Sequence, residues 1–322
     1  MSTAFYSHPD CKLHEMGDWH PESPARLQAI EDQLIASRID GFLAYREAPL
    51  AADAAINRVH DAQVLQQLRA QLPKEMPGQP FAGPYFPLDD DTALNPFSLR
   101  AAQRAAGAAI AATDAVLAGE VENAFCAVRP PGHHARPSTP MGFCLFNNVA
   151  IAALHALDHH GLERVAIIDF DVHHGNGTEE AFCNDPRVLM ASFFQHPFYP
   201  FSGVDSADPM QPRAPNMLNH PLPAYANGEV VRQLVTDVWL PALDAHRPQM
   251  LFISAGFDAH REDDIGQMGL VEADYAWITQ QLVMLADRHA QGRIVSTLEG
   301  GYNLSALARS VVAHVRALAR LD

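Results

Sequence analysis

Five short apolar runs are spread along the chain, and each one ends in a polar loop that contains glycine. Runs of this length, bounded by turn residues, predict strands that are buried in the core. They cover residues 123–128, 164–169, 187–194, 249–254 and 293–298.

Longer helix-forming segments lie between these runs, at residues 98–119, 147–161, 228–246 and 272–292. Strands that alternate with helices predict an α/β fold, in which a parallel sheet carries helices on both faces. Ligands of such sheets bind at the carboxyl ends of the strands. The unusual polar residues of this chain follow its predicted strands, so we expect the site at that edge.

No repeat, low-complexity tract or linker divides the sequence, and we therefore expect one domain over residues 1–322. Residues 208–223 contain five prolines and predict a long loop near the site, either ordered or mobile.

The composition is that of a globular protein with a large core, because 48% of the residues are apolar. The 38 acidic residues outnumber the 22 basic ones and give a formal net charge of −16, which disfavours nonspecific binding of nucleic acid. A cationic substrate would suit this charge, although a solvated acidic surface is the more common explanation.

The four cysteines are scattered and form no CxxC pair, so neither a disulfide framework nor a structural zinc site is expected. The first ten residues do not resemble a signal peptide. No apolar stretch approaches the roughly 18 residues that span a bilayer. We expect a cytoplasmic enzyme that does not bind membranes.

The segment DFDVHHGNG (169–177) places two carboxylates and two imidazoles at the end of a predicted buried strand. Such groups need a cation, a proton relay or solvent to compensate them. Residues two apart on a strand share a face, so Asp169, Asp171 and His173 can point to one side. With Asp258 from another strand end they suit the open site of a catalytic Zn²⁺, Fe²⁺, Co²⁺ or Mn²⁺ ion. Caps and ion pairs explain any one of these residues, but not the converging set.

Two further loops carry candidate catalytic groups. His133 and His134 are adjacent at the end of another strand, where an imidazole pair suits proton transfer near neutral pH. Gly300 and Gly301 permit a tight turn that would direct the Tyr302 hydroxyl towards an oxyanion, although aromatic residues beside glycine turns are more often packing groups. No GxSxG, P-loop or Rossmann motif is present, so the chemistry indicates hydrolysis by metal-activated water.

Six segments follow one another from about residue 14 to residue 303: HEMGDWHPESPARL, RPPGHHA, GFCLFNNVAIAA, DFDVHHGNGTEEAF, SAGFDAH and LEGGYN. Together they resemble the histone deacetylase superfamily, most closely its class II and bacterial branch, which includes acetoin-utilisation and acetylpolyamine amidohydrolase proteins. The resemblance implies the arginase-like α/β fold with a central eight-stranded parallel sheet. It also implies a zinc-dependent amide hydrolase, with Fe²⁺ as the alternative metal, that acts on acyl-lysine in a protein or peptide or on a small acylated amine.

The matched positions imply individual roles for the metal and the base. Asp171, His173 and Asp258 would bind the zinc ion. His133 would be the general base, oriented by Asp169.

The remaining catalytic positions are also matched. His134 would assist charge stabilisation or protonation of the leaving group, and Tyr302 would polarise the substrate carbonyl. Asn176 stands where class I enzymes have an aspartate paired to the second histidine, and it is the residue of class II members. Tyr302 is retained, unlike in the weakly active class IIa enzymes, so the resemblance implies real deacetylase activity.

The family has a narrow acyl-lysine tunnel, whose matching substrate-binding residues here are Gly142, Phe143, Tyr199, Ile265 and Gly301. Tyr199 replaces the usual phenylalanine, and PFSG replaces the common PGTG, so the acyl preference stays open. Polyamine-selective relatives have a glutamate at the position of Ile265, and the isoleucine therefore favours acyl-lysine or a neutral small molecule.

The resemblance implies two more features beside the zinc ion. Arg26 matches an arginine near an internal cavity behind the metal. The family also binds K⁺, through residues that match Asp169, Asp171, His173 and Ser192.

Three alternatives stay open. One is an acetylpolyamine amidohydrolase. A second is an arginase-type ureohydrolase, which binds two manganese ions through DxDxxDP, whereas SAGFDAHRED offers one carboxylate at the matching position. A third is a noncatalytic binding protein that retains the metal, for which the His133, His134 and Tyr302 set would be superfluous. The physiological substrate is not defined, and a homo-oligomer is compatible with the sequence.

Overall fold

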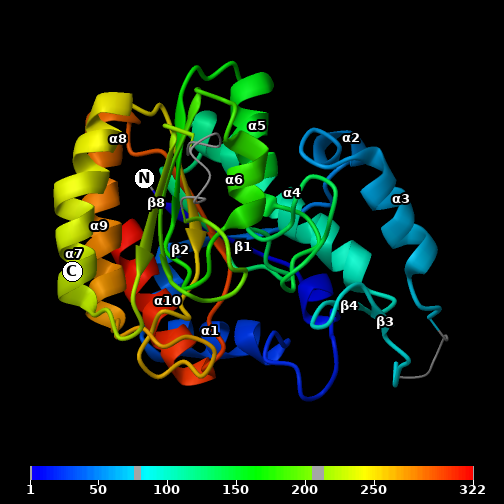
Figure 1. Cartoon of the computed structure of the whole chain (residues 1–322). Coiled ribbons are helices and arrows are strands. Elements are labelled where there is room, and N and C mark those ends of the chain that lie inside the picture. The colour runs from blue at the N-terminus through cyan, green and yellow to red at the C-terminus, as the bar shows by residue number, and fades with distance from the viewer. Residues whose placement is uncertain (1, 76–80, 205–213, 322) are drawn as a thin grey trace.

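Eight parallel strands form the central sheet of the protein (Figure 1). The structure is a computed structural model that describes residues 2–75, 81–204 and 214–321. Across the sheet the strands follow the order β2, β1, β5, β10, β9, β6, β7, β8. Their bounds are Thr3–Ser7 (β1), Leu43–Glu47 (β2), Asn123–Cys126 (β5), Val165–Asp169 (β6), Val188–Gln195 (β7), Met217–Leu222 (β8), Leu251–Ala255 (β9) and Ile294–Leu298 (β10).

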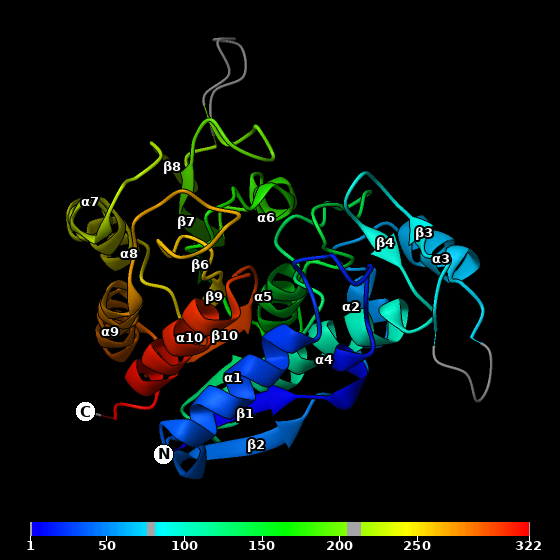
Figure 2. The ribbon, with the colours of Figure 1, turned by 90° about the horizontal axis from the view of Figure 1, so that it is seen from below.

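Helices cover both faces of the sheet, as predicted (Figure 2). One layer contains α1, α7, α8, α9 and α10, and the other contains α4, α5 and α6, with α2 and α3 beyond it. Among the described residues, no helix is both long enough and apolar enough to cross a membrane. The bounds are Ala25–Ala36 (α1), Asp53–Ile56 (α2), Ala62–Gln71 (α3), Ser98–Leu117 (α4), Asn148–Asp158 (α5), Asn176–Phe182 (α6), Gly228–Leu234 (α7), Leu240–His246 (α8), Glu272–His289 (α9) and Leu304–Leu318 (α10).

The five predicted strands correspond to β5, β6, β7, β9 and β10, with ends that differ by at most two residues. Every residue of these strands is buried. Strands covered by helices on both faces are apolar throughout, which is why runs of apolar residues revealed them.

The strands β1, β2 and β8 were not predicted, and β8 shows that the loop prediction for 208–223 is wrong in part. Residues 208–213 lie outside the described residues, but Met217–Leu222 forms β8, which pairs with β7. Pro221 is tolerated because β8 lies at the edge of the sheet, where one side of the strand makes no ladder.

The predicted helix 228–246 is one continuous helical segment, but α7 and α8 are joined by a π-helical turn over Val235–Trp239. Pro241 lies in the first turn of α8 and has no N–H to donate to the preceding turn. In the π turn before it, Leu240 N donates to Val235 O, five residues back.

Strand order brings the polar loops together. β10 lies between β5 and β9, and β9 pairs with β6. Because all four strands are parallel, the loops that follow them leave the sheet at the same edge. This edge holds the candidate site.

Candidate active site

Three ligand-type side chains meet at the carboxyl edge of the sheet. Donor atoms of Asp171, His173 and Asp258 all lie within 4.8 Å of one another, and all three residues are buried. His173 Nδ1 is 2.9 Å from Asp171 Oδ1 and 3.2 Å from Asp258 Oδ2. The structure thus brings together the three predicted metal ligands from the ends of β6 and β9.

Backbone groups fix the orientation of the two carboxylates. Gly300 N donates to Asp171 Oδ2 at 2.9 Å, and Val172 N donates to Asp258 Oδ1 at 2.8 Å. Asp258 Oδ2 is buried and has no hydrogen-bond partner in the described part of the chain. A buried carboxylate oxygen of this kind requires compensation. A cation between Asp171, His173 and Asp258 would supply it, so the donor set fits a metal.

Two glycines leave room for the carboxylates. A Cβ atom at Gly300 would lie 2.1 Å from Asp258 Oδ2, and one at Gly256 would lie 2.0 Å from Asp171 Oδ2. Any side chain at either position would displace the Asp171 and Asp258 carboxylates. The glycines of the motifs SAGFDAH and LEGGYN therefore have a steric reason in this fold.

Asp171, Asp258 and His173 shift one another's pKa values. Burial raises the pKa of Asp258 to about 7, and the neighbouring Asp171 carboxylate adds to the effect. Burial alone would lower the pKa of His173, but its hydrogen bond to Asp171 and the charges of Asp258 and Asp171 outweigh burial and raise the pKa to about 9. Two carboxylates therefore compete for positive charge, which is the condition under which a divalent cation is stabilised.

His133 and His134 lie in the loop after β5 and have different partners. His133 Nδ1 is 2.9 Å from Asp169 Oδ2, and its Nε2 is 3.8 Å from Asp171 Oδ1, so Nε2 faces the three ligand-type residues. His134 Nδ1 is 2.8 Å from Asn176 Oδ1. Because the amide oxygen accepts from Nδ1–H, a neutral His134 has an unprotonated Nε2.

The two imidazoles differ in their affinity for a proton. Burial would lower the pKa of His133, but the charges of Asp169 and Asp171 outweigh burial and hold it well above 6.5. Burial and the nearby His133 hold the pKa of His134 well below 6.5. Titratable neighbours whose pKa values are driven apart are typical of acid and base pairs in active sites.

Glu299 supports the histidine loop and was not found from the sequence. Its Oε2 accepts hydrogen bonds from Gly132 N at 2.6 Å and His133 N at 3.1 Å. Its Oε1 accepts from Ser254 Oγ at 3.0 Å. Burial raises the pKa of Glu299 to about 7. Its place directly after a predicted strand, inside LEGGYN, was the available signal.

Tyr302 is held by the residues around its turn. Its N–H and that of Asn303 donate to Asp263 Oδ2 at 2.6 and 3.0 Å. The Arg26 guanidinium carbon lies 4.9 Å from the centre of the Tyr302 ring, and Arg26 Nε donates to Gly301 O at 2.7 Å. Burial and the nearby acidic side chains raise the pKa of Tyr302 well above 10, against the effect of Arg26. The phenol therefore keeps its proton at neutral pH and can donate it in a hydrogen bond.

A cavity of about 200 Å³ opens onto this group of residues. Four of the predicted tunnel residues line it, whereas Gly301 is not among the lining residues of the described chain. The lining consists of Asp91, His134, Gly142, Phe143, His173, Phe198, Tyr199, Ile265 and Tyr302.

Aromatic side chains make the cavity narrow. The Phe198 ring stacks on His173 with centres 5.3 Å apart, and Phe143 meets Tyr302 edge-on at 5.8 Å. Gly142 has φ +57°, and a Cβ there would lie 2.7 Å from His134 Cδ2. Only glycine keeps this wall open.

Asp91 and Phe198 line the cavity and were not found from the sequence. Asp91 lies in the turn between two short antiparallel strands, β3 (Phe86–Pro87) and β4 (Ala93–Leu94). The run of three aspartates at 89–91 is the sequence feature that could have revealed it. Burial and a hydrogen bond with Asp89 raise the pKa of Asp91 to about 6.

The predicted potassium residues are neighbours across two strands. The register of β6 and β7 pairs Asp169 with Ser192, next to Asp171 and His173. Ser192 Oγ donates to Asn219 Oδ1 at 3.1 Å.

Comparison with known proteins identifies the family of the chain. The histone deacetylase domain family matches residues 20–318. The chain is 39% identical over 286 residues to the histone deacetylase-like amidohydrolase of Pseudomonas aeruginosa, a match that covers 88% of this chain and 73% of that protein. It is 34% identical over 318 residues to the human polyamine deacetylase HDAC10, covering 96% of this chain and 45% of the human protein.

A solved structure shares the whole fold. The crystal structure of the HDA15 HD domain matches with a TM-score of 0.89 and 33% identity, covering 99% of this chain and 89% of that one. The family model and these relatives identify the chain as a deacetylase hydrolase. This chain belongs to the histone deacetylase family. The described residues hold one group of three metal-type donors at this edge, which does not support the two-metal alternative of a ureohydrolase.

Proposed function

We propose that this deacetylase removes acetyl or another acyl group from the side-chain amine of acyl-lysine. The observation that supports it most directly is the cluster of three buried metal-type ligands, one of which, His173, lines a cavity with aromatic walls. An extended, uncharged acyl-lysine stem suits aromatic walls such as those of Phe143 and Phe198.

In this proposal Asp171, His173 and Asp258 hold Zn²⁺, with Fe²⁺ as the alternative. Two carboxylates and one imidazole suit either ion. When bound, the ion supplies a Lewis acid that polarises the acyl carbonyl and lowers the pKa of water. We further propose that K⁺ binds beside this site at Asp169, Asp171, His173 and Ser192.

The protein's own groups move the protons. His133 Nε2 would take a proton from the attacking water once a cation compensates the Asp171 charge that otherwise favours the protonated imidazole, while Asp169 holds the Nδ1–H and stabilises the imidazolium that forms. The water oxygen bonds to the acyl carbon, and Tyr302 donates a hydrogen bond to the carbonyl oxygen as negative charge develops there. When the C–N bond breaks, the leaving amine takes a proton from His133. His134 helps to stabilise the charge that develops during the reaction. The products are the carboxylic acid and the free amine.

Hydrolysis of acetylpolyamines is a second candidate, favoured by one observation. Asp91 lines the cavity and offers a carboxylate to a second ammonium of the substrate. HDAC10, a polyamine deacetylase, is among the relatives. Against this candidate, Ile265 offers no charge, and Asp263 is occupied by the N–H groups of Ile265, Tyr302 and Asn303.

The two candidates are separated by kcat/KM on an acetyl-lysine peptide and on acetylspermidine with the zinc-loaded enzyme. We expect the peptide to be the better substrate. A tenfold preference for acetylspermidine would replace the first candidate with the second. Hydrolysis of neither would favour a noncatalytic binding protein.

A further inference from the structure

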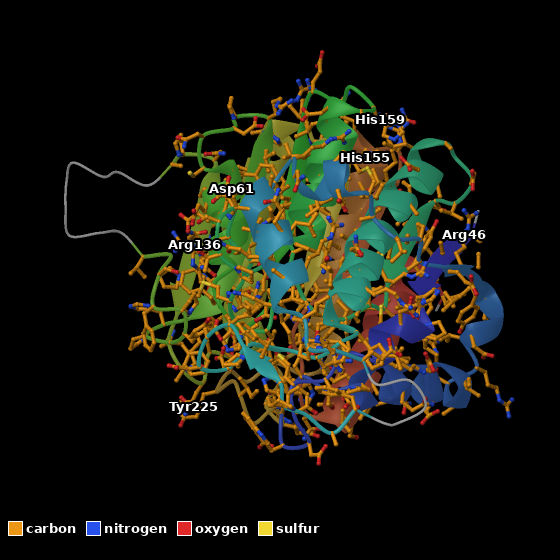
Figure 3. All side chains as sticks on the ribbon, turned by 90° about the vertical axis from the view of Figure 1, so that its right-hand side faces the viewer. Arg46, Asp61, Arg136, His155, His159 and Tyr225 are labelled. Atoms are coloured by element: carbon orange, nitrogen blue, oxygen red, sulfur yellow. The ribbon has the colours of Figure 1, made fainter. Side chains whose placement is uncertain are left out.

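A second cluster of histidines lies far from the active site, at the carboxyl end of α5. His155 is on the last turn of the helix, and His159 and His160 follow directly. One nitrogen of each imidazole lies within 4.8 Å of one nitrogen of the other two. In Figure 3, the labelled His155 and His159 lie together at the upper end of the molecule.

The helix geometry explains why the three rings meet. His155 and His159 are four residues apart and share a helix face. Their rings stack with centres 4.8 Å apart and an interplanar angle of 15°. The His160 ring stands edge-on to both, at 5.1 Å from His155 and 5.0 Å from His159.

A carboxylate from the neighbouring helix completes the cluster. Asp114 of α4 has Oδ1 2.7 Å from His155 Nε2 and also 2.7 Å from His160 Nε2. Arg58 Nη1 lies 3.3 Å from His155 Nδ1. Because a guanidinium only donates, His155 Nδ1 accepts this bond while its Nε2–H donates to Asp114, so an ion bound by His155 would take the place of Arg58 at Nδ1.

We propose that His155, His159, His160 and Asp114 form a second metal site, for a divalent transition ion such as Zn²⁺, Ni²⁺, Co²⁺ or Cu²⁺. Neutral imidazole nitrogens and one carboxylate oxygen are the ligands that these ions prefer, whereas Mg²⁺ and Ca²⁺ prefer oxygen alone. Three imidazoles and one carboxylate also match the coordination number of four that zinc adopts in proteins.

Two features of the surroundings favour a cation there. The last carbonyl groups of α5 carry the negative end of the helix dipole, which stabilises positive charge at this end. His159 and His160 are exposed, so an ion can reach the cluster from solvent.

The site is separate from the catalytic one. The amino end of α5 is the end that faces the active-site loops, since Asn147 and Asn148 bond to Thr178 and Pro130 there. The eleven residues of α5 then carry the chain about 16 Å away, at 1.5 Å per residue. An ion at the histidine cluster therefore touches none of the proposed catalytic residues.

The test is the metal content of the full-length protein after equilibration with a small excess of Zn²⁺ and gel filtration. We expect two zinc ions per chain for the wild type and one for His159→Ala/His160→Ala, with deacetylase turnover unchanged within about twofold. Both histidines are exposed, so the variant should fold. Titration with Ni²⁺ should show the same additional site in the wild type and its loss in the variant.

Two further variants sharpen the result. His289→Ala removes a histidine that is also paired with an aspartate, Asp244 at 2.8 Å, but that belongs to no group of three metal-type donors among the described residues, and it should retain both ions. Asp114→Asn should weaken the second site at least tenfold, as loss of a charged partner does. A wild type that holds a single zinc ion, or a double variant that still holds two, would overturn the proposal.

Discussion

Asp258 Oδ2 lies 3.2 Å from His173 Nδ1, although the two residues follow different strands of the sheet. The same oxygen has no hydrogen-bond partner among the described residues, while the other oxygen of Asp258 accepts from Val172 N. A carboxylate that is held by the backbone on one side and makes only an ion pair with an imidazole on the other is oriented for a cation. The predictions below test the roles of the groups around this position.

Tyr302→Phe should fold normally and lose on the order of 10²-fold or more in turnover, as enzymes do when one oxyanion donor is removed. KM should change far less, because the ring that lines the cavity is kept. Tyr199→Phe is the matched control, since it removes a hydroxyl from the same cavity and should keep most of the turnover. Normal turnover with a raised KM in Tyr302→Phe would show that Tyr302 is only a cavity wall.

His133→Ala should be nearly inactive at every pH, because the attacking water loses the group that takes its proton. The wild-type rate should fall on the acid side, where this base becomes protonated. A pH–rate profile of both proteins checks the role. A wild-type rate that stays flat well below the imidazole range of about 6 to 7 would contradict it.

Ile265→Glu should raise kcat/KM on acetylpolyamines relative to acetyl-lysine. The side chain at this position lines the cavity, and a carboxylate there would compensate a substrate ammonium that isoleucine leaves unpaired. Ile265→Gln has nearly the same shape without the charge and should not change the ratio. Equal effects of the two substitutions would show that charge at this position does not select the substrate.

Acid should destabilise the fold through buried neutral histidines. His314 Nδ1 is 2.6 Å from Thr279 Oγ1 and its Nε2 is 2.8 Å from Ser296 Oγ, and burial lowers its pKa to about 3. Between an unfolded pKa of about 6.5 and the folded value, only the unfolded chain binds this proton, so the free energy of unfolding falls as pH falls.

The expected contribution of His314 is about 1.4 kcal/mol per pH unit in that range. Urea unfolding of the wild type and of His314→Gln between pH 6 and pH 4 measures it, since the variant should depend less steeply on pH. Burial also lowers the pKa of His14 to about 3, and this histidine contributes the same pH dependence to the free energy of unfolding of both proteins. Parallel pH dependences would contradict the assignment.

The sequence predicted the parts of the fold in which one local pattern determines the structure. Strands such as β6 are buried on both faces and are therefore apolar at every position. β8 escaped prediction because Pro221 is compatible with a strand only at the edge of a sheet, and the sequence does not define the edge.

Residues that act through long-range contacts were also missed. Glu299 accepts from the backbone of Gly132 and His133, which are distant in sequence, and no local pattern reports such a contact. Asp91 reaches the cavity from a hairpin whose packing is equally nonlocal. Asp171, His173 and Asp258 could be predicted from the sequence because each follows a strand, and parallel strands end at one edge.

The central claim is that a metal held by Asp171, His173 and Asp258 is required for deacetylation. The direct measurement is active-site metal content together with acetate release from an acetyl-lysine peptide, in the wild type and in Asp258→Ala, with the second site removed by His159→Ala/His160→Ala. Asp264→Ala, an exposed aspartate nearby, is the control and should behave as the wild type. We expect one ion and turnover in the parent protein, and loss of most of both in Asp258→Ala, because three ligands are the minimum for an open site. A stoichiometric ion and full turnover in Asp258→Ala would contradict the account.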